Sequence, residues 1–104
     1  MSPLLRIKRC CLSGRVVFTD KADTERVAGG LSHADVIEAI VNAPAVYKTL
    51  RSRALVKQRR NEKLYVVIGI THEGILVYTK GALRNLEGEE VFYLLVSAKR
   101  SIEP

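Results

Sequence analysis

Leu64–Thr79 reads LYVVIGITHEGILVYT and decides the fold of this 104-residue chain. Its two apolar runs, Leu64–Thr71 and Gly74–Thr79, are rich in the β-branched and aromatic residues that favour strands. The connection between the runs is short enough for a hairpin. Similar runs lie before and after them, at Ala45–Arg53 and Glu90–Ala98, so the sequence predicts one mostly antiparallel sheet of about four strands.

The first half of the chain has the pattern of helices. Asp20 can cap a helix that runs to Ala28, where two glycines end it. Ser32 is a suitable cap for a second helix, His33–Asn42, whose apolar residues recur on one face. Because the helices come first and the hairpin-linked strands follow, we expect an α+β fold with two N-terminal helices packed on one face of the sheet.

The remaining segments give weaker patterns. Leu4–Arg9, within residues 1–14, fits either a short strand or a flexible basic arm, and Val16–Thr19 fits a short β-strand or an extended entry to the first helix. Lys80–Glu89 contains two glycines and predicts a longer turn before the last strand. A chain of this length with 47% apolar residues can fill one core, so residues 1–104 are expected to form a single domain.

Length and composition argue against several classes of protein. The apolar runs are far shorter than the roughly 20 residues of a membrane helix, and basic residues interrupt Met1–Leu12, so we expect no membrane partner and a cytoplasmic protein. Cys10 and Cys11 are adjacent and are expected to be reduced thiols. Because the histidines and cysteines lack zinc-ligand spacing and no glycine-rich phosphate loop is present, no metal and no cofactor is expected.

The positive charge is concentrated in one segment. The chain has 17 Lys and Arg against 11 Asp and Glu, a formal net charge of +6. Between residues 48 and 63 the one acid is Glu62, and the basic residues are Lys48, Arg51, Arg53, Lys57, Arg59, Arg60 and Lys63. Clustered guanidinium groups bind phosphate oxygens and attract polyanions. The segment therefore predicts a phosphate-binding surface, although a solvated loop is the plainer interpretation of any charge run.

Strand alternation predicts which side chains lie together on this surface. If Ala45–Arg53 is a strand, Tyr47, Thr49, Arg51 and Arg53 share one face. A tyrosine among arginines offers a ring on which a base can stack. We therefore expect single-stranded RNA as the partner, and the excess of one charge sign favours this over a merely soluble loop. The expected RNA-binding residues are Arg51, Arg53, Tyr47, Lys57, Arg59 and Arg60.

Three motifs resemble one known family. Tyr65–Lys80 is similar to the central hairpin of MqsR-type toxins, within the wider RelE/BrnT-like group, whose members cleave messenger RNA and are paired with antitoxins. Gly30–Val36 resembles the family's Gly-Leu-Ser-x-x-Asp-Phe helix start, and Arg51–Arg53 its Arg-x-Arg before the hairpin. Together the motifs cover roughly half of the chain. The resemblance implies a RelE-like fold, an RNA substrate and an antitoxin as partner.

The resemblance also implies functional positions, of which two are kept and two are changed. The family's strand tyrosine corresponds to Tyr65 and its hairpin lysine to Lys80. A family lysine corresponds to Glu38 and a family glutamine to Tyr47. The implied fold and RNA-directed ancestry are thus better supported than cleavage itself.

Metal-independent RNA cleavage by the adjacent 2′-OH needs a base, cations around the phosphate and an acid for the leaving oxygen. Lys80, Arg51 and Arg53 could supply the cations, and Tyr65 or Tyr47 could position or transfer a proton. His72 is the side chain best suited to titrate near neutral pH. The candidate catalytic residues of an endoribonuclease are therefore Lys80, Tyr65, Arg51 and His72.

Other functions stay open on the sequence. The main alternative is a non-catalytic module whose basic face docks an acidic protein, for example an antitoxin. A double-stranded DNA binder ranks last, because His33–Asn42 has no Lys or Arg with which to read a groove. Val91–Val96 is apolar on both faces, so a central strand there would need cover on both sides, and a homodimer is a further expectation.

Overall fold

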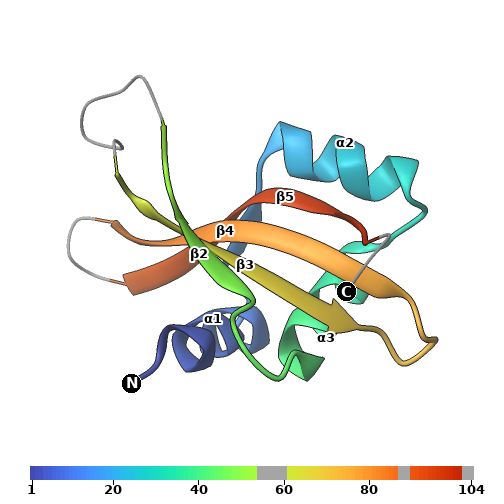
Figure 1. The fold of residues 1–104 in the computed structure, drawn as a ribbon, viewed down its shortest axis with the longest axis horizontal. Helices are drawn as coiled ribbons and strands as arrows, with labels where there is room; N and C mark the ends of the chain where they lie inside the picture. Colours follow the sequence, from blue (N-terminus) through green and yellow to red (C-terminus); the bar gives the residue numbers. More distant parts are fainter. Residues whose placement is uncertain (54–60, 87–89, 102–104) are drawn as a thin grey trace.

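The computed structural model describes residues 1–53, 61–86 and 90–101 and has an α+β architecture (Figure 1). The described residues form three helices, α1 (Pro3–Leu12), α2 (Asp20–Ala28) and α3 (His33–Asn42). They also form five strands, β1 (Val16–Phe18), β2 (Lys48–Arg51), β3 (Lys63–Ile70), β4 (Leu76–Leu86) and β5 (Glu90–Arg100). The predicted α+β class is confirmed, and the predicted numbers of helices and strands are too low.

The strands form one mixed sheet in the order β1-β5-β4-β3-β2. Neighbours among β2, β3, β4 and β5 are antiparallel, whereas β1 runs parallel to β5 and pairs Val17 with Leu94. The predicted hairpin is confirmed between β3 and β4, and β5 lies inside the sheet. The short run after Arg15, expected as a short strand or an extended entry, is an edge strand.

The predicted turn over Lys80–Glu89 is wrong as far as Leu86, because β4 continues as a strand to that residue, and residues 87–89 of the prediction lie outside the described residues. Gly81 suggested a turn, but a glycine is needed at this position because the neighbouring strand packs too closely for a side chain. A Cβ on Gly81 would lie 2.6 Å from the ring of Tyr93 and 2.7 Å from the carbonyl oxygen of Leu94. The register shifts between Lys80 and Gly81, so the strand bends here without ending.

The N-terminal segment is a helix, and the predicted strand or flexible arm is wrong. Ser2 is the N-cap and accepts a hydrogen bond from the Leu5 N–H at 3.2 Å, and Pro3 occupies the first turn, where its missing N–H has no cost. Its buried residues, Ile7, Cys10 and Cys11, lie three and four positions apart and pack into the core.

The other two helices begin and end near the predicted residues. Thr19, not Asp20, caps α2 by accepting a hydrogen bond from the Ala22 N–H. Ser32 and Asp35 form a complete capping box at α3, as the sequence predicted. No helix in the described ranges is long and apolar enough to cross a membrane.

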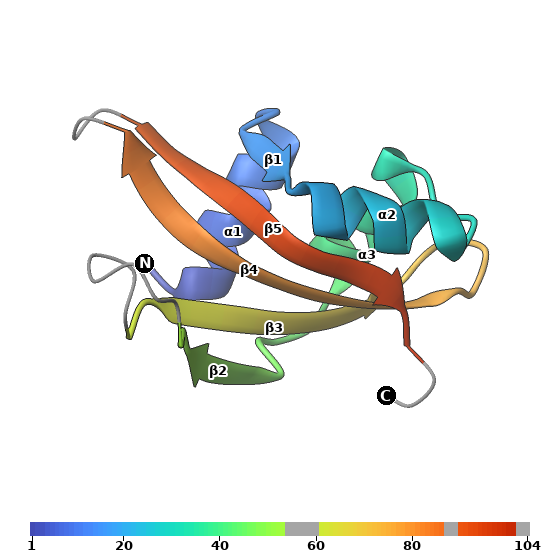
Figure 2. The ribbon, with the colours of Figure 1, turned by 90° about the horizontal axis from the view of Figure 1, so that it is seen from above.

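Helices α1 and α3 cover one face of the sheet (Figures 1 and 2). The core between them includes Tyr65 and Val67 of β3 and Tyr93 of β5. Helix α3 lies very close to β3, because a Cβ on Gly69 would be only 1.8 Å from the Ala39 carbonyl oxygen. The glycine therefore permits the contact between helix and strand. The opposite face of the sheet is free of described helices.

Helix α2 runs beside β5, where β1 has ended (Figure 2). The Glu25 carboxylate accepts hydrogen bonds from the Ser97 hydroxyl at 2.6 Å and from the Ala98 N–H at 3.1 Å. Burial raises the pKa of Glu25, but these hydrogen bonds and the nearby charges of Lys21 and Lys99 together outweigh it, so the pKa lies below its usual value. Glu25 thus satisfies donors of β5 that no strand reaches.

Candidate functional site

The helix-free face of the sheet, here called the open face, is set by the strand register. Lys48 of β2 pairs with Val66 of β3, which pairs with Lys80 of β4, so these three side chains lie in one row. The next row includes Leu50, which pairs with Leu64. Val66 is fully buried yet lies outside the core under the helices, which agrees with its position on this face.

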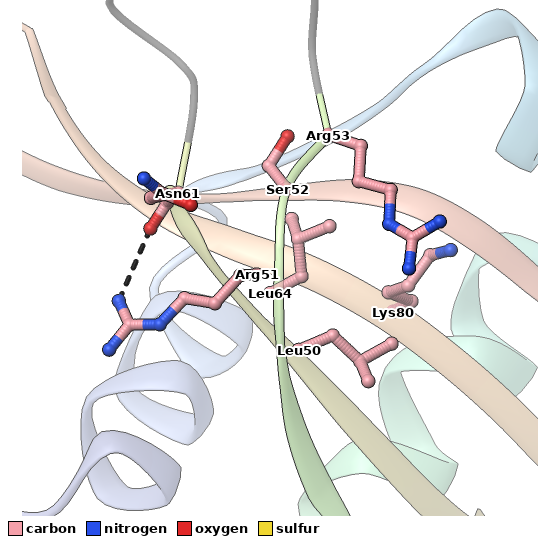
Figure 3. A pocket seen from close by; sticks show the side chains of 7 residues that line it. All are labelled: Leu50, Arg51, Ser52, Arg53, Asn61, Leu64 and Lys80. Atoms are coloured by element: carbon pink, nitrogen blue, oxygen red, sulfur yellow. Dashed lines mark hydrogen bonds between the residues drawn. The ribbon is translucent and has the colours of Figure 1, made fainter.

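A pocket of about 620 Å³ opens at one end of this face, where β2 ends and β3 begins (Figure 3). Leu50 and Leu64 supply its apolar part. The side chains of Arg53 and Lys80 lie on the same side of β2 in Figure 3 and both line the pocket. The lining residues are Leu50, Arg51, Ser52, Arg53, Asn61, Leu64 and Lys80.

The pocket is cationic, and its cations have no acidic partner among the described residues. None of the described lining residues is an acid, and within the described part of the chain neither Arg53 nor Lys80 forms an ion pair. The neighbouring acid, Glu62, is held by Arg84, whose Nε and Nη2 each lie 3.0 Å from a carboxylate oxygen. Two like charges beside an apolar surface favour an anion between them.

Arg51 and Arg53 do not share a face, and the prediction that they do is wrong. Strand β2 ends at Arg51, so the two-residue alternation does not extend to Arg53. The guanidinium of Arg51 points away from Lys80 and donates a hydrogen bond to the Asn61 carbonyl oxygen at 3.2 Å (Figure 3). Arg51 pairs with Lys63 in the register and lies at the pocket wall without directing its charge toward Arg53.

Tyr65 is not part of this pocket. It pairs with Gly81 while its neighbour Val66 pairs with Lys80, so Tyr65 and Lys80 point to opposite faces of the sheet. Its side chain is buried in the core with Tyr93, whose hydroxyl donates to the Tyr65 carbonyl oxygen at 3.4 Å. The sheet therefore separates two residues that were expected to act together.

His72 lies in the turn between β3 and β4, at the opposite end of the sheet from the pocket (Figure 1). Its backbone N–H donates to Glu38 Oε1 at 2.6 Å, and its Nε2 is 3.7 Å from Glu38 Oε2. Glu38, where the family resemblance implies a lysine, thus fastens this turn to α3. The structure does not bring His72 to Lys80 or Arg51.

The remaining predicted binding residues also lie apart from the pocket or are not described. Tyr47 is 58% exposed just before β2, and the Lys48 ammonium lies 6.0 Å from the centre of its ring. Tyr47 does not line the pocket. Lys57, Arg59 and Arg60 lie outside the described residues.

Two features of the site were missed by sequence reasoning. Leu50 and Leu64 form the apolar part of the pocket, and the hairpin register that pairs them is the signal that could have shown this. The Arg84–Glu62 pair was also missed, because Arg84 was placed in a turn. Among residues 1–53, 61–86 and 90–101, no group of three His, Cys, Asp or Glu could hold a metal ion.

Comparison of the chain with protein-family models, with curated proteins and with solved structures gave no match. The resemblance to MqsR-type toxins therefore stays a prediction from the residues quoted above.

Proposed function

We propose that this protein binds single-stranded RNA on the open face of its sheet, with a phosphate group held between Arg53 and Lys80. One observation carries the proposal: Arg53 and Lys80, which form no ion pair with any described residue, line a pocket to which Leu50 and Leu64 add apolar surface. A phosphate between them would relieve their repulsion and release counterions.

The apolar part of the pocket favours a nucleic acid over an acidic peptide. Leu50 and Leu64 are half-buried and border the two cations, so a ligand that carries apolar surface beside its negative charge fits best. A nucleotide has this character, since its base presents a flat apolar face next to a phosphate. An unpaired strand can lay its bases on a sheet, whereas a duplex hides them in its stack.

The arrangement supports binding better than cleavage. Arg53 and Lys80 could stabilise charge on a phosphate, but no described lining residue is a His, Tyr, Asp or Glu. Tyr65 lies in the core and His72 lies at the far end of the sheet. Metal-independent endoribonuclease activity would therefore need a proton-transfer group beyond the described lining residues, and RNA binding is the part of the toxin-like function that we propose.

Binding of a labelled RNA of about 12 nucleotides, measured in EDTA over a series of salt concentrations, tests the proposal. Each phosphate contact contributes about 0.7 to the slope of log affinity against log salt for a single strand. Arg53→Ala and Lys80→Ala should each weaken binding and lower the slope by up to about 0.7, because both cations hold the same phosphate. Lys21→Ala, which removes an exposed charge on α2 whose side chain is 63% accessible, is the control and should leave the slope unchanged.

Two results would contradict the proposal. Wild-type protein that does not bind the RNA refutes it directly. Equal competition by polyglutamate and by unlabelled RNA would favour the acidic-protein alternative. The same samples, run on a denaturing gel, show whether the strand is cut in the absence of metal.

A further inference from the structure

A second basic cluster lies on the N-terminal helix. Residues 1–19 contain no Asp or Glu, and their basic residues are Arg6, Lys8, Arg9 and Arg15. Lys8 is engaged, because its ammonium donates to the Ala43 carbonyl oxygen at 2.6 Å. The other three line a pocket of about 310 Å³ together with Met1, Cys10 and Val91.

The three arginines are placed to accept an anion. Arg6 and Arg9 are exposed and three positions apart on α1, so they share a face of the helix. Arg15 is half-buried, and its Nε donates to the Val91 carbonyl oxygen at 2.9 Å, which fixes the guanidinium at the pocket. In the part of the chain that the structure describes, none of the three has an ion-pair partner.

Both basic pockets lie at the same end of the sheet. Val91, at the start of β5, pairs with Asn85 near the end of β4. The adjacent Arg84 holds Glu62, next to Asn61 of the first pocket. Val91 packs against the core under the helices, so the second pocket lies on the helix-covered side.

The edge between the two sides is also cationic. Arg51 and Lys63 are register partners and are both exposed there. Lys63 is two residues from Tyr65, and Arg51 is two residues from Thr49, the register partner of Tyr65, so both point to the same helix-covered side as Tyr65. A row of positive charge therefore leads from the pocket on the open face toward α1.

We infer that Arg6, Arg9 and Arg15 bind a second phosphate of the same RNA strand, which passes round this end of the sheet from one pocket to the other. The inference rests on the proposed function and extends it, because it assigns α1 to the binding site. The ligand class is a single-stranded polynucleotide long enough to reach both pockets.

The double variant Arg6→Ala/Arg9→Ala tests the inference, with Lys21→Glu as a control that changes the net charge equally. Alanine is favourable in an exposed helix position, and circular dichroism checks that α1 is retained. Because the three arginines hold one phosphate, the double variant should lower the salt slope by about 0.7. Between about 50 and 200 mM salt its loss of affinity should therefore be about 2.6-fold smaller than that of the wild type. Lys21→Glu should leave the slope unchanged.

The outcomes separate this inference from the proposed function. If wild-type protein binds RNA and Arg53→Ala weakens it, but the double variant has the slope of Lys21→Glu, then the α1 site is refuted and the open-face site stands. If wild-type protein does not bind RNA, both are refuted.

Discussion

Replacing Glu25 tests how α2 completes the edge of the sheet. Its carboxylate accepts two hydrogen bonds, at 2.6 Å from the buried Ser97 hydroxyl and at 3.1 Å from the Ala98 N–H. A hydrogen bond to a charged group contributes about 1.5–3 kcal/mol, and an unpaired buried donor is costly. The Glu25 side chain is 21% accessible, so water can replace part of the loss, and we expect Glu25→Ala to cost about 3 kcal/mol.

Urea denaturation at neutral and acidic pH measures this loss, with Thr24→Ala on the exposed side of the same helix as the control. Burial raises the pKa of Glu25 but the hydrogen bonds and the nearby charges of Lys21 and Lys99 together lower it further, so in the folded protein it lies below its usual value of 4.5. The stabilisation is therefore complete above that value and is lost as the pH falls through the folded pKa. A loss below about 1 kcal/mol at neutral pH, or one that does not shrink in acid, would refute this reasoning.

Three further predictions concern packing, thiol chemistry and the far turn. Gly69→Ala would place a Cβ 1.8 Å from the Ala39 carbonyl oxygen, so the melting temperature measured by thermal denaturation should fall by roughly 15 °C. An unchanged melting temperature would contradict the close packing of α3 on β3. Burial raises the pKa of Cys10 and raises that of Cys11 to about 12, so iodoacetamide should modify both thiols only after the protein unfolds. Rapid labelling of the native protein, detected by mass spectrometry, would be evidence against their burial. His72→Ala should leave the affinity for labelled RNA and its salt slope unchanged. A tenfold loss of RNA affinity in this variant would show that the turn between β3 and β4 takes part in binding.

The sequence predicted the elements whose signals are local. The capping box at Ser32 and the apolar face of α3 are contained within ten residues, and the β3–β4 hairpin has a short connection. The Ser2-Pro3 helix start was equally local and was overlooked because the basic residues of α1 suggested an arm. Gly81 was misleading for a different reason: it accommodates Tyr93, a residue twelve positions away.

The site was predicted in part for the same reason. Arg53 and Lys80 were named from charge and from the family resemblance, and the structure brings both to one pocket. That Tyr65 lies on the other face depends on the β3–β4 register, and the direction of Arg51 depends on where β2 ends. Neither property follows from the composition of one segment. That the α1 arginines line a pocket at the same end of the sheet likewise depends on the fold.

Nuclear magnetic resonance of the isotope-labelled protein during titration with single-stranded RNA tests the central claim most directly. We expect the largest amide shifts at Leu50, Arg53, Leu64 and Lys80, at the end of the open face. Shifts concentrated around His72 and Glu38, or no shifts at RNA concentrations that saturate binding of the labelled RNA, would contradict RNA binding at this site.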